Sequence, residues 1–205
     1  KVFVVADCTG HGVPGSMVSM TGNSLLNDIV NERNITSPDH ILNELHKGIL
    51  KTFKKEGGQQ VTDGMDATIV SIDKKSGKLY FSGAVNPLYI IQKGELKVIK
   101  GDVWSIGGAG LFRPGTPLEE RKFSIHEIDI QEDMQFYMFT DGYIDQFGGN
   151  ENKKFNNKRF KELLLDISQL KPNEQIKKIK TTIKKWMSTS QKGQIDDMLV
   201  VGFRA

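Results

Sequence analysis

A single cysteine, Cys8, occurs among the 205 residues of the chain. One thiol cannot form an intramolecular disulfide, and it cannot supply the several cysteines of a structural zinc site. The shortage of cysteine is typical of a protein from a reducing compartment. We therefore expect the protein to be cytoplasmic.

Long hydrophobic runs and a strong excess of one charge are also missing. No segment approaches the roughly 18 apolar residues that cross a bilayer, so we expect no membrane contact by this domain. The 28 basic and 25 acidic residues leave a net charge of +3, too small an excess to indicate nucleic-acid binding. With 38% hydrophobic residues, the chain can bury an ordinary core, and a single domain over 1–205 is expected.

The first third of the chain reads as a strand followed by two helices. An apolar strand at 2–6 leads into a glycine-rich turn at 8–12, after which Pro14 opens a helix. A second helix begins after Ser37 as N-cap and ends near Gly57.

The first of these helices carries several large apolar residues. We expect two of them, Met17 and Met20, to be buried in the core, because burial is the usual state of methionine. A surface used for dimerisation is the alternative.

The middle of the chain changes to short strand-like runs. Two hairpin signals, Lys75-Ser76-Gly77 and Lys93-Gly94, predict that these runs pair as an antiparallel meander. The predicted strands are 67–72, 78–82, 88–92 and 95–99.

Glycine and proline interrupt regular structure at 101–122. This loop carries Trp104, Phe112 and Arg113. It is predicted either as a flap that docks a substrate or as a loop whose hydrophobic side chains pack back onto the core.

Strands and helices alternate irregularly in the last part of the chain. Two strands at 124–130 and 134–140 flank a tight turn at Glu132-Asp133. Two amphipathic helices around Phe160 and Ile179 follow, and a strand at 198–203 ends the pattern. This order predicts an α+β fold with antiparallel sheets covered by helices.

Acidic residues stand at the ends of the most apolar strands. Asp7 and Asp141 each follow such a strand, and Asp196-Asp197 precede another. An aspartate at a strand end is commonly a turn or capping residue. Three of them at core strands also suggest a site for a hard cation, because carboxylates near a core need pairing or a metal.

The sequence segments around these aspartates are more specific than the aspartates alone. The three main segments are DCTGHGVP at 7–14, FTDGYID at 139–145 and IDDMLVV at 195–201. Three further segments, GMDAT at 64–68, SGAVNP at 82–87 and DQFGG at 145–149, add to the pattern. Together they resemble the SpoIIE-like (RsbU-type) bacterial branch of the PPM metal-dependent serine/threonine protein phosphatases, over almost the whole chain.

This resemblance implies a fold of two packed antiparallel β-sheets flanked by helices, with a two-metal site at one end of the sandwich. The cofactors would be two divalent cations, Mn²⁺ or Mg²⁺. By resemblance, Asp7, Asp141 and Asp196 hold one cation, and Asp7 and the backbone carbonyl of Cys8 hold the other. Asp197 stays an alternative to Asp196, because neighbouring side chains of an extended segment point in opposite directions.

The family pattern also requires an acidic residue in an upstream Gly-Gly-Asp-type motif. The sequence starts only six residues before Asp7, so that motif has no counterpart here. We therefore expect a phosphatase domain truncated at its N-terminus, without its first strand or strands; a naturally defective member of the family is the alternative. The second cation would then bind weakly, and the activity of the truncated chain is left open.

Other positions are candidates for contact with the substrate. His11 could protonate the leaving oxygen, or it could hydrogen-bond a backbone carbonyl under the turn. Gly10, Gly142 and Arg113 are predicted substrate-binding residues. Gly10 and Gly12 are also expected to adopt backbone angles that other residues avoid, and as a lone Gly-x-Gly they do not indicate a nucleotide site.

The resemblance implies hydrolysis of phosphoserine or phosphothreonine on a bacterial regulatory protein, typically an anti-sigma-factor antagonist. The resemblance also implies that a sensory domain precedes the phosphatase domain in the full-length protein and that two copies of the protein form a homodimer. Metal-activated water needs no protein nucleophile. Two alternatives are another metal hydrolase, such as a phosphodiesterase, and a metal-poor pseudophosphatase that acts by binding or dimerisation.

Overall fold

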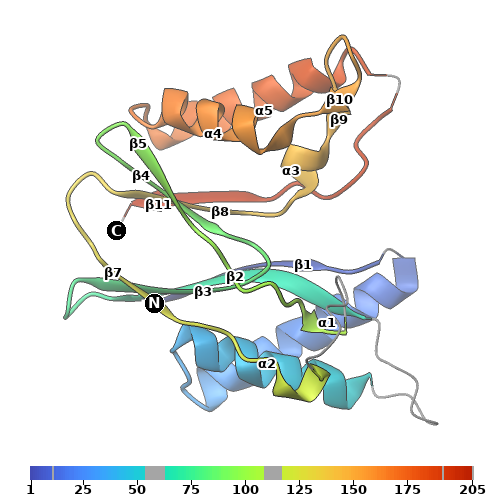
Figure 1. Cartoon of the computed structure of the whole chain (residues 1–205), viewed down its shortest axis with the longest axis vertical. Coiled ribbons are helices and arrows are strands. Elements are labelled where there is room, and N and C mark those ends of the chain that lie inside the picture. The colour runs from blue at the N-terminus through green and yellow to red at the C-terminus, as the bar shows by residue number, and fades with distance from the viewer. Residues whose placement is uncertain (11, 54–62, 109–116, 191, 205) are drawn as a thin grey trace. The chain divides into compact units, whose positions relative to one another are not determined.

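The computed structural model of the chain describes residues 1–10, 12–53, 63–108, 117–190 and 192–204 (Figure 1). Contacts divide the chain into two compact units. The N-terminal unit comprises Lys1–Leu88 and Ile99–Gln131, and the C-terminal unit comprises Tyr89–Val98 and Glu132–Ala205. Each unit combines an antiparallel sheet with helices, which confirms the predicted α+β class.

The N-terminal unit is built on a five-stranded sheet in the order β1-β2-β3-β7, with β6 paired to the start of β2. The expected strand at 2–6 is present and extends to Cys8. The β2–β3 hairpin turns at Gly77, whose positive φ of 67° fits the predicted turn. The strands are β1 (Val2–Cys8), β2 (Gly64–Asp73), β3 (Lys78–Ala84), β6 (Ile106–Gly107) and β7 (His126–Asp129).

Helices cover one face of this sheet (Figure 1). They are α1 (Gly12–Asn27), a short π-helix at Asp28–Glu32, and α2 (Pro38–Thr52). Ser37 has the extended backbone of an N-cap, as predicted. The expected end of α2 near Gly57 is wrong, because the backbone already leaves the helical region at Phe53.

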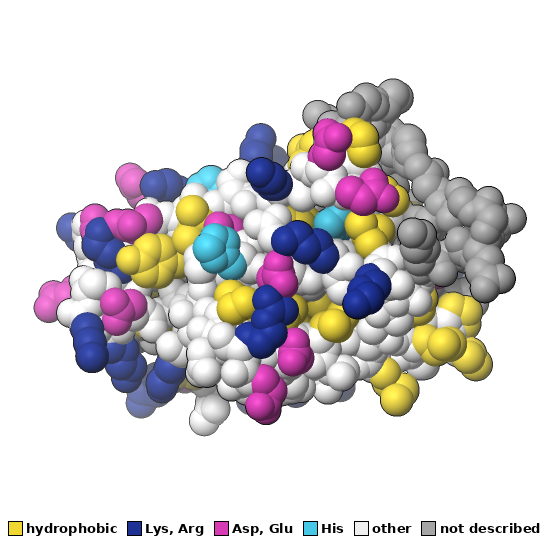
Figure 2. Space-filling model, turned by 90° about the horizontal axis from the view of Figure 1, so that it is seen from below, with side chains coloured by type: hydrophobic (Ala, Val, Ile, Leu, Met, Phe, Trp, Pro, Cys, Tyr) yellow, Lys and Arg dark blue, Asp and Glu magenta, His cyan; other side chains and the backbone are white. Residues whose placement is uncertain are grey.

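The predicted burial of Met17 and Met20 is also wrong. Their exposed fractions are 55% and 74%, while α1 buries Val18 and Gly22 on another stripe. A Cβ on Gly22 would stand 2.5 Å from the Met65 methyl group, so small residues bring this helix close to the sheet. Figure 2 views the molecule from the side of α1 and α2, where hydrophobic side chains lie among charges of both signs.

The predicted meander is only partly correct. β2 and β3 pair as expected, but β4 and β5 belong to the sheet of the C-terminal unit. Val85 takes a positive φ of 67° after β3, and Pro87 has no N–H for a sheet ladder. The chain therefore leaves the first sheet at this point.

The turn at Asp133 shows the same kind of difference. Asp133 has a φ of 63°, which confirms the tight turn. The two strands that flank it do not form a hairpin, however, because β7 pairs with β3 and β8 lies between β11 and β4.

The C-terminal unit has a four-stranded sheet in the order β11-β8-β4-β5 and a small β9–β10 hairpin. Both predicted amphipathic helices are present, as α4 and α5. The helices are α3 (Gly142–Asp145), α4 (Asn156–Ile167) and α5 (Pro172–Met187). The strands are β4 (Leu88–Gln92), β5 (Glu95–Ile99), β8 (Gln135–Phe139), β9 (Phe147–Gly148), β10 (Lys153–Lys154) and β11 (Val200–Arg204).

An aromatic core fixes the end of β8. The ring centroids of Phe139 and Phe160 lie 4.8 Å apart, and Tyr143 lies 5.0 Å from Phe160. Every residue of β8 is buried. The residues that directly follow this strand, including Asp141, are therefore carried on a rigid support.

The loop at 101–122 packs against the N-terminal unit in its described part. Trp104 contacts the core cluster, and the Arg121 guanidinium lies 5.2 Å from its ring centroid. Trp104 thus follows the alternative in which the loop packs back onto the core. Phe112 and Arg113 lie outside the described residues.

His46 of α2 forms hydrogen bonds with two residues of this loop. The Gly107 N–H donates to His46 Nδ1 at 2.9 Å, so the ring proton is on Nε2, which donates to the Leu118 carbonyl at 2.7 Å. Burial lowers the pKa of His46 below 6.5, and the nearby Arg121 lowers it further. Protonation would cost the Gly107 hydrogen bond and place a charge in a buried site.

We expect stability to fall in mild acid because of His46. Its pKa is lower in the folded protein than in the unfolded chain, so its contribution is present above pH 6.5 and is lost as the pH falls through the folded pKa. Urea unfolding of the protein and of His46→Gln at pH 7.5 and 5.5 measures this loss. A pH dependence that is unchanged in His46→Gln would contradict the assignment.

Candidate metal centre

Asp7 is the penultimate residue of β1 and lies on the sheet face that points away from the helices. Alternate residues of β1, including Ala6 and Cys8, pack against the helix cluster, so Val5 and Asp7 point to the other face. Val5 is buried and Asp7 is half-buried. A carboxylate thus stands at the end of an apolar strand, as the sequence predicted.

The loop after Asp7 is tightly fixed. The Thr9 hydroxyl donates to the Gly64 carbonyl and accepts from the Gly64 N–H, both at 2.9 Å. Gly10 and Gly12 have φ values of 86° and 66°, which confirms the expected unusual backbone angles. A Cβ on Gly15 would stand 2.6 Å from the Gly10 carbonyl oxygen, so α1 begins in direct contact with this loop.

Cys8 directs its side chain toward the helices. Burial raises the pKa of its thiol, partly offset by a hydrogen bond with Ser19. The thiol is therefore neutral near pH 7 and is not an activated nucleophile. The expected metal contact through the Cys8 carbonyl stays a prediction.

Asp66 is a neighbour of Asp7 that the sequence reading assigned no role. The β1–β2 register places Asp66 directly opposite Asp7, so both side chains lie on the same sheet face. The Ser105 hydroxyl donates to Asp66 Oδ1 at 2.5 Å. Its segment, GMDAT, carries part of the family resemblance, but only the strand register brings Asp66 beside Asp7.

The C-terminal unit brings Asp141 and Asp196 together. A carboxylate oxygen of each lies within 4.8 Å of the other. Thr140 makes this possible, because its backbone N–H donates to the Leu199 carbonyl and its hydroxyl donates to the Asp197 carbonyl, each at 3.0 Å. The segment before β11 is thereby tied to the end of β8.

Gly142 allows the same segment to approach closely. A Cβ at this position would overlap the Asp197 carbonyl oxygen and stand 3.3 Å from the Asp196 Cβ. Close packing thus explains why a glycine stands at position 142. The expected role of Gly142 in substrate binding stays a prediction. The expected role of Gly10 in substrate binding also stays a prediction.

The charges around Asp141 are not balanced. Partial burial raises the pKa of Asp141, and the negative charges of Asp145 and Asp196 raise it further. Lys154 offsets this only in part, since its ammonium pairs with Asp145 at 2.6 Å. Two carboxylates that repel each other at the end of a core strand form a suitable donor pair for a hard divalent cation.

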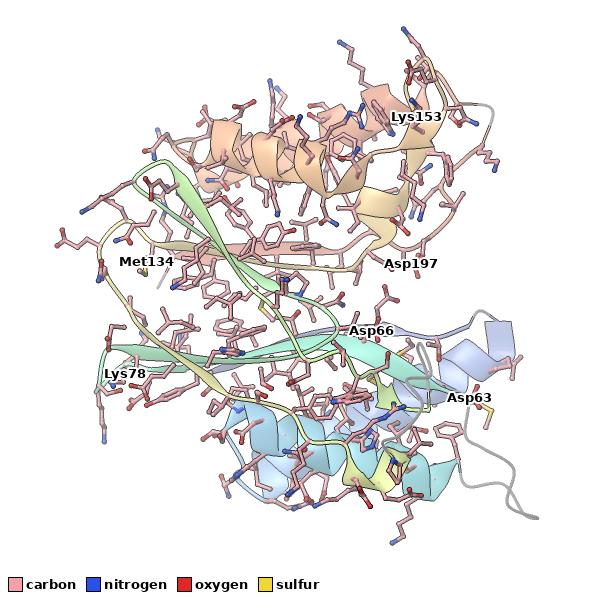
Figure 3. All side chains as sticks on the ribbon, in the orientation of Figure 1. Asp63, Asp66, Lys78, Met134, Lys153 and Asp197 are labelled. Atoms are coloured by element: carbon pink, nitrogen blue, oxygen red, sulfur yellow. The ribbon has the colours of Figure 1, made fainter. Side chains whose placement is uncertain are left out.

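Asp196 and Asp197 differ in their surroundings; Figure 3 labels Asp197, in the segment that precedes β11. The Asp196 carboxylate lies near Asp141 and accepts from the Asp197 N–H at 2.8 Å. Asp197 contributes its carbonyl oxygen to the Thr140 hydroxyl. This favours Asp196 over Asp197 as the partner of Asp141, although the ligand role of either residue stays a prediction.

Two candidates cannot be placed. His11 and Arg113 lie outside the described residues, so their roles stay predictions. Across the described ranges, no helix has both the length and the apolar character needed to cross a bilayer.

Residues 2–205 match the family described as stage II sporulation protein E (SpoIIE). No curated protein matches the chain in sequence. The SiaA-PP2C domain of Pseudomonas aeruginosa is 26% identical with a TM-score of 0.84, and the match covers 100% of this chain and 75% of that one.

Two further solved structures share the fold at lower identity. The PP2C phosphatase domain of SpoIIE from Bacillus subtilis, solved with a fragment of its regulatory domain, is 15% identical with a TM-score of 0.68, covering 98% of this chain and 53% of that one. RsbX in complex with magnesium is 14% identical with a TM-score of 0.61, covering 98% and 79%. With the family match over 2–205, these structures show that the chain belongs to the SpoIIE family of PP2C-type (PPM) phosphatase domains.

Proposed function

We propose that this protein hydrolyses phosphoserine or phosphothreonine on a bacterial regulatory protein, in a reaction that requires divalent cations. The observation that carries this proposal is the Asp141–Asp196 carboxylate pair, whose oxygens lie within 4.8 Å. The raised pKa of Asp141 supports it: burial is the main cause, and the repulsion from Asp145 and Asp196 that adds to it is what a cation would relieve. The match to a phosphatase family supports phosphate-ester hydrolysis as the reaction for which this pair would bind a cation.

The cation ligands follow from the family motif. Asp7, Asp141 and Asp196 would hold one cation, and Asp7 with the Cys8 carbonyl would hold a second, Mn²⁺ or Mg²⁺. Oxygen-only donors fit these hard cations. RsbX, a structural relative, was solved with magnesium. Bound cations would supply an activated water and neutralise charge on the phosphoryl oxygens.

The residues around the carboxylates position them. Thr140 and Gly142 hold the Asp196 segment against the end of β8. Thr9 and Gly15 hold the loop after Asp7. We propose that both units act as one catalytic domain over 1–205, because the residues proposed to bind the cations come from both units.

The biological setting is part of the same proposal. The substrate would be an anti-sigma-factor antagonist or a similar cytoplasmic signalling protein. A sensory domain would regulate the phosphatase, as is suggested by Bacillus subtilis SpoIIE, whose phosphatase domain was solved with a fragment of its regulatory domain. His11, Gly10, Gly142 and Arg113 remain candidates for contact with the phosphoprotein, and a homodimer remains the proposed assembly.

The substrate class is tested by offering two phosphate esters in Mn²⁺. A phosphoserine peptide should release phosphate, while bis(p-nitrophenyl) phosphate should react far more slowly. Preference for the diester would indicate the phosphodiesterase alternative. Binding of Mn²⁺ without turnover of either ester would indicate a pseudophosphatase.

Neighbouring aspartates provide a matched pair for the ligand assignment. We expect Asp196→Asn to weaken Mn²⁺ binding by about tenfold or more, because a charged donor is lost. Asp197→Asn removes the same charge one residue away and should change affinity far less. Isothermal titration with Mn²⁺ measures both. A larger loss in Asp197→Asn would reverse the assignment.

A further inference from the structure

A pocket of about 520 Å³ lies in the C-terminal unit, between α5 and the segment 149–155. Its apolar wall is formed by Phe155 and Trp186. Lys178 and Lys185 line it from α5, with Thr181 and Thr182 in between. None of these residues belongs to the carboxylate site, so the pocket is separate from the proposed metal centre.

The aromatic wall is held in place before any ligand binds. The Trp186 indole N–H donates to the Gln146 carbonyl at 3.1 Å, and the Phe155 ring meets the indole edge-on at 5.4 Å. The Arg159 guanidinium lies 4.9 Å from the indole centroid. A Cβ on Gly149 would stand 2.7 Å from the indole ring. A pre-ordered apolar wall loses little conformational entropy on binding.

The helix beside this pocket carries a concentrated positive charge. Its sequence, PNEQIKKIKTTIKKWM, contains five lysines and one acidic residue, a net charge of +4. The whole chain carries only +3. All five lysines are exposed. In the described part of the chain, the lysines in ion pairs are Lys47, Lys78, Lys153 and Lys154, so none lies on α5.

The lysines fall on two sides of the helix. Lys178 and Lys185 line the pocket, whereas Lys177 and Lys184 do not. Each pair is separated by seven residues, or two helical turns, which is about 10.5 Å along the axis. The pocket side therefore presents two cations with two threonines between them, and Trp186 directly follows the second cation, Lys185.

We propose that this pocket binds an acidic polypeptide segment. A bulky apolar side chain of the segment packs against Trp186, which the buried Phe155 supports, and acidic residues of the segment pair with Lys178 and Lys185. The Thr181 hydroxyl already donates to the Lys178 carbonyl at 3.1 Å, so it accepts a hydrogen bond from a backbone N–H of the segment. The confined apolar wall favours a peptide over a nucleic acid, which would need a broader basic surface. This site goes beyond the proposed phosphatase function and does not rest on it.

Fluorescence polarisation tests the site with a labelled peptide that has two glutamates on each side of one phenylalanine, in metal-free buffer. Lys178→Glu/Lys185→Glu should weaken binding by about tenfold or more, since two exposed charge pairs become repulsive. The matched control Lys177→Glu/Lys184→Glu changes the charge equally on the other side of α5 and should have an effect of about twofold. Thr181→Trp, at an exposed helix position, should block the pocket without a change in charge.

Several outcomes would overturn the proposal. An equal loss in both lysine pairs would mean unspecific attraction to a basic helix. Undiminished binding of a peptide with alanine in place of phenylalanine would exclude the apolar wall. A single-stranded oligonucleotide that binds more tightly than the peptide would point to a nucleic acid, and no peptide binding at all would refute the site.

Discussion

Asp141→Asn is expected to abolish cation-dependent phosphate release, with a loss of at least about 100-fold in kcat/KM. Asp141 lies two residues after the end of the fully buried strand β8, and its carboxylate lies near that of Asp196. Asparagine keeps the size of the side chain and removes the charge that a cation would need. Steady-state assays with a phosphoserine peptide in Mn²⁺ measure the loss.

Asp145→Asn is the matched control for this variant. It removes the same charge from the short helix α3, but Asp145 already pairs with Lys154. We expect its kcat/KM to stay within about threefold of the unchanged protein, because an exposed ion pair contributes little. Equal losses in both variants would show that the charge of the segment matters and that Asp141 has no special role.

Gly142→Ala is expected to damage both stability and cation binding. The new methyl group would overlap the Asp197 backbone, which cannot move aside as a flexible side chain could. Overpacking of this kind costs about 1–3 kcal/mol. The displaced Asp196 would also bind Mn²⁺ less well. Urea unfolding and Mn²⁺ titration measure the two effects.

Gly193→Ala provides the control at a nearby glycine. A Cβ there meets no atom within 4 Å, and its backbone is not left-handed. This variant should be neutral or slightly stabilising, because alanine restricts the unfolded chain. If Gly142→Ala were equally harmless, the close approach of the Asp196 segment to α3 would not be needed for the fold.

Local signals predicted the individual elements well. The bounds of β4 and β5 agree with the sequence reading, because glycine and proline mark their ends. Ser37 was identified as an N-cap from residue type and position alone. Asp141 and Asp196 were singled out because they end or precede apolar strands, which is visible in sequence.

Features that depend on distant contacts were missed. The apolar pattern of α1 did not reveal that Val18 faces the sheet while Met17 does not. The hairpin signals predicted that β2, β3, β4 and β5 form one meander, but β4 and β5 lie in the second sheet. Asp66 gained meaning only through its register with Asp7. Pairing across long sequence separations leaves no local trace in residue type.

The removal and return of the cation test the central claim most directly. The protein is treated with EDTA, dialysed, and assayed on a phosphoserine peptide before and after Mn²⁺ is added. We predict no phosphate release without the cation and full recovery with it, and no recovery in Asp141→Asn. Release that persists without a cation, or that Asp141→Asn retains, would contradict the assignment of these carboxylates as a metal-dependent phosphatase site.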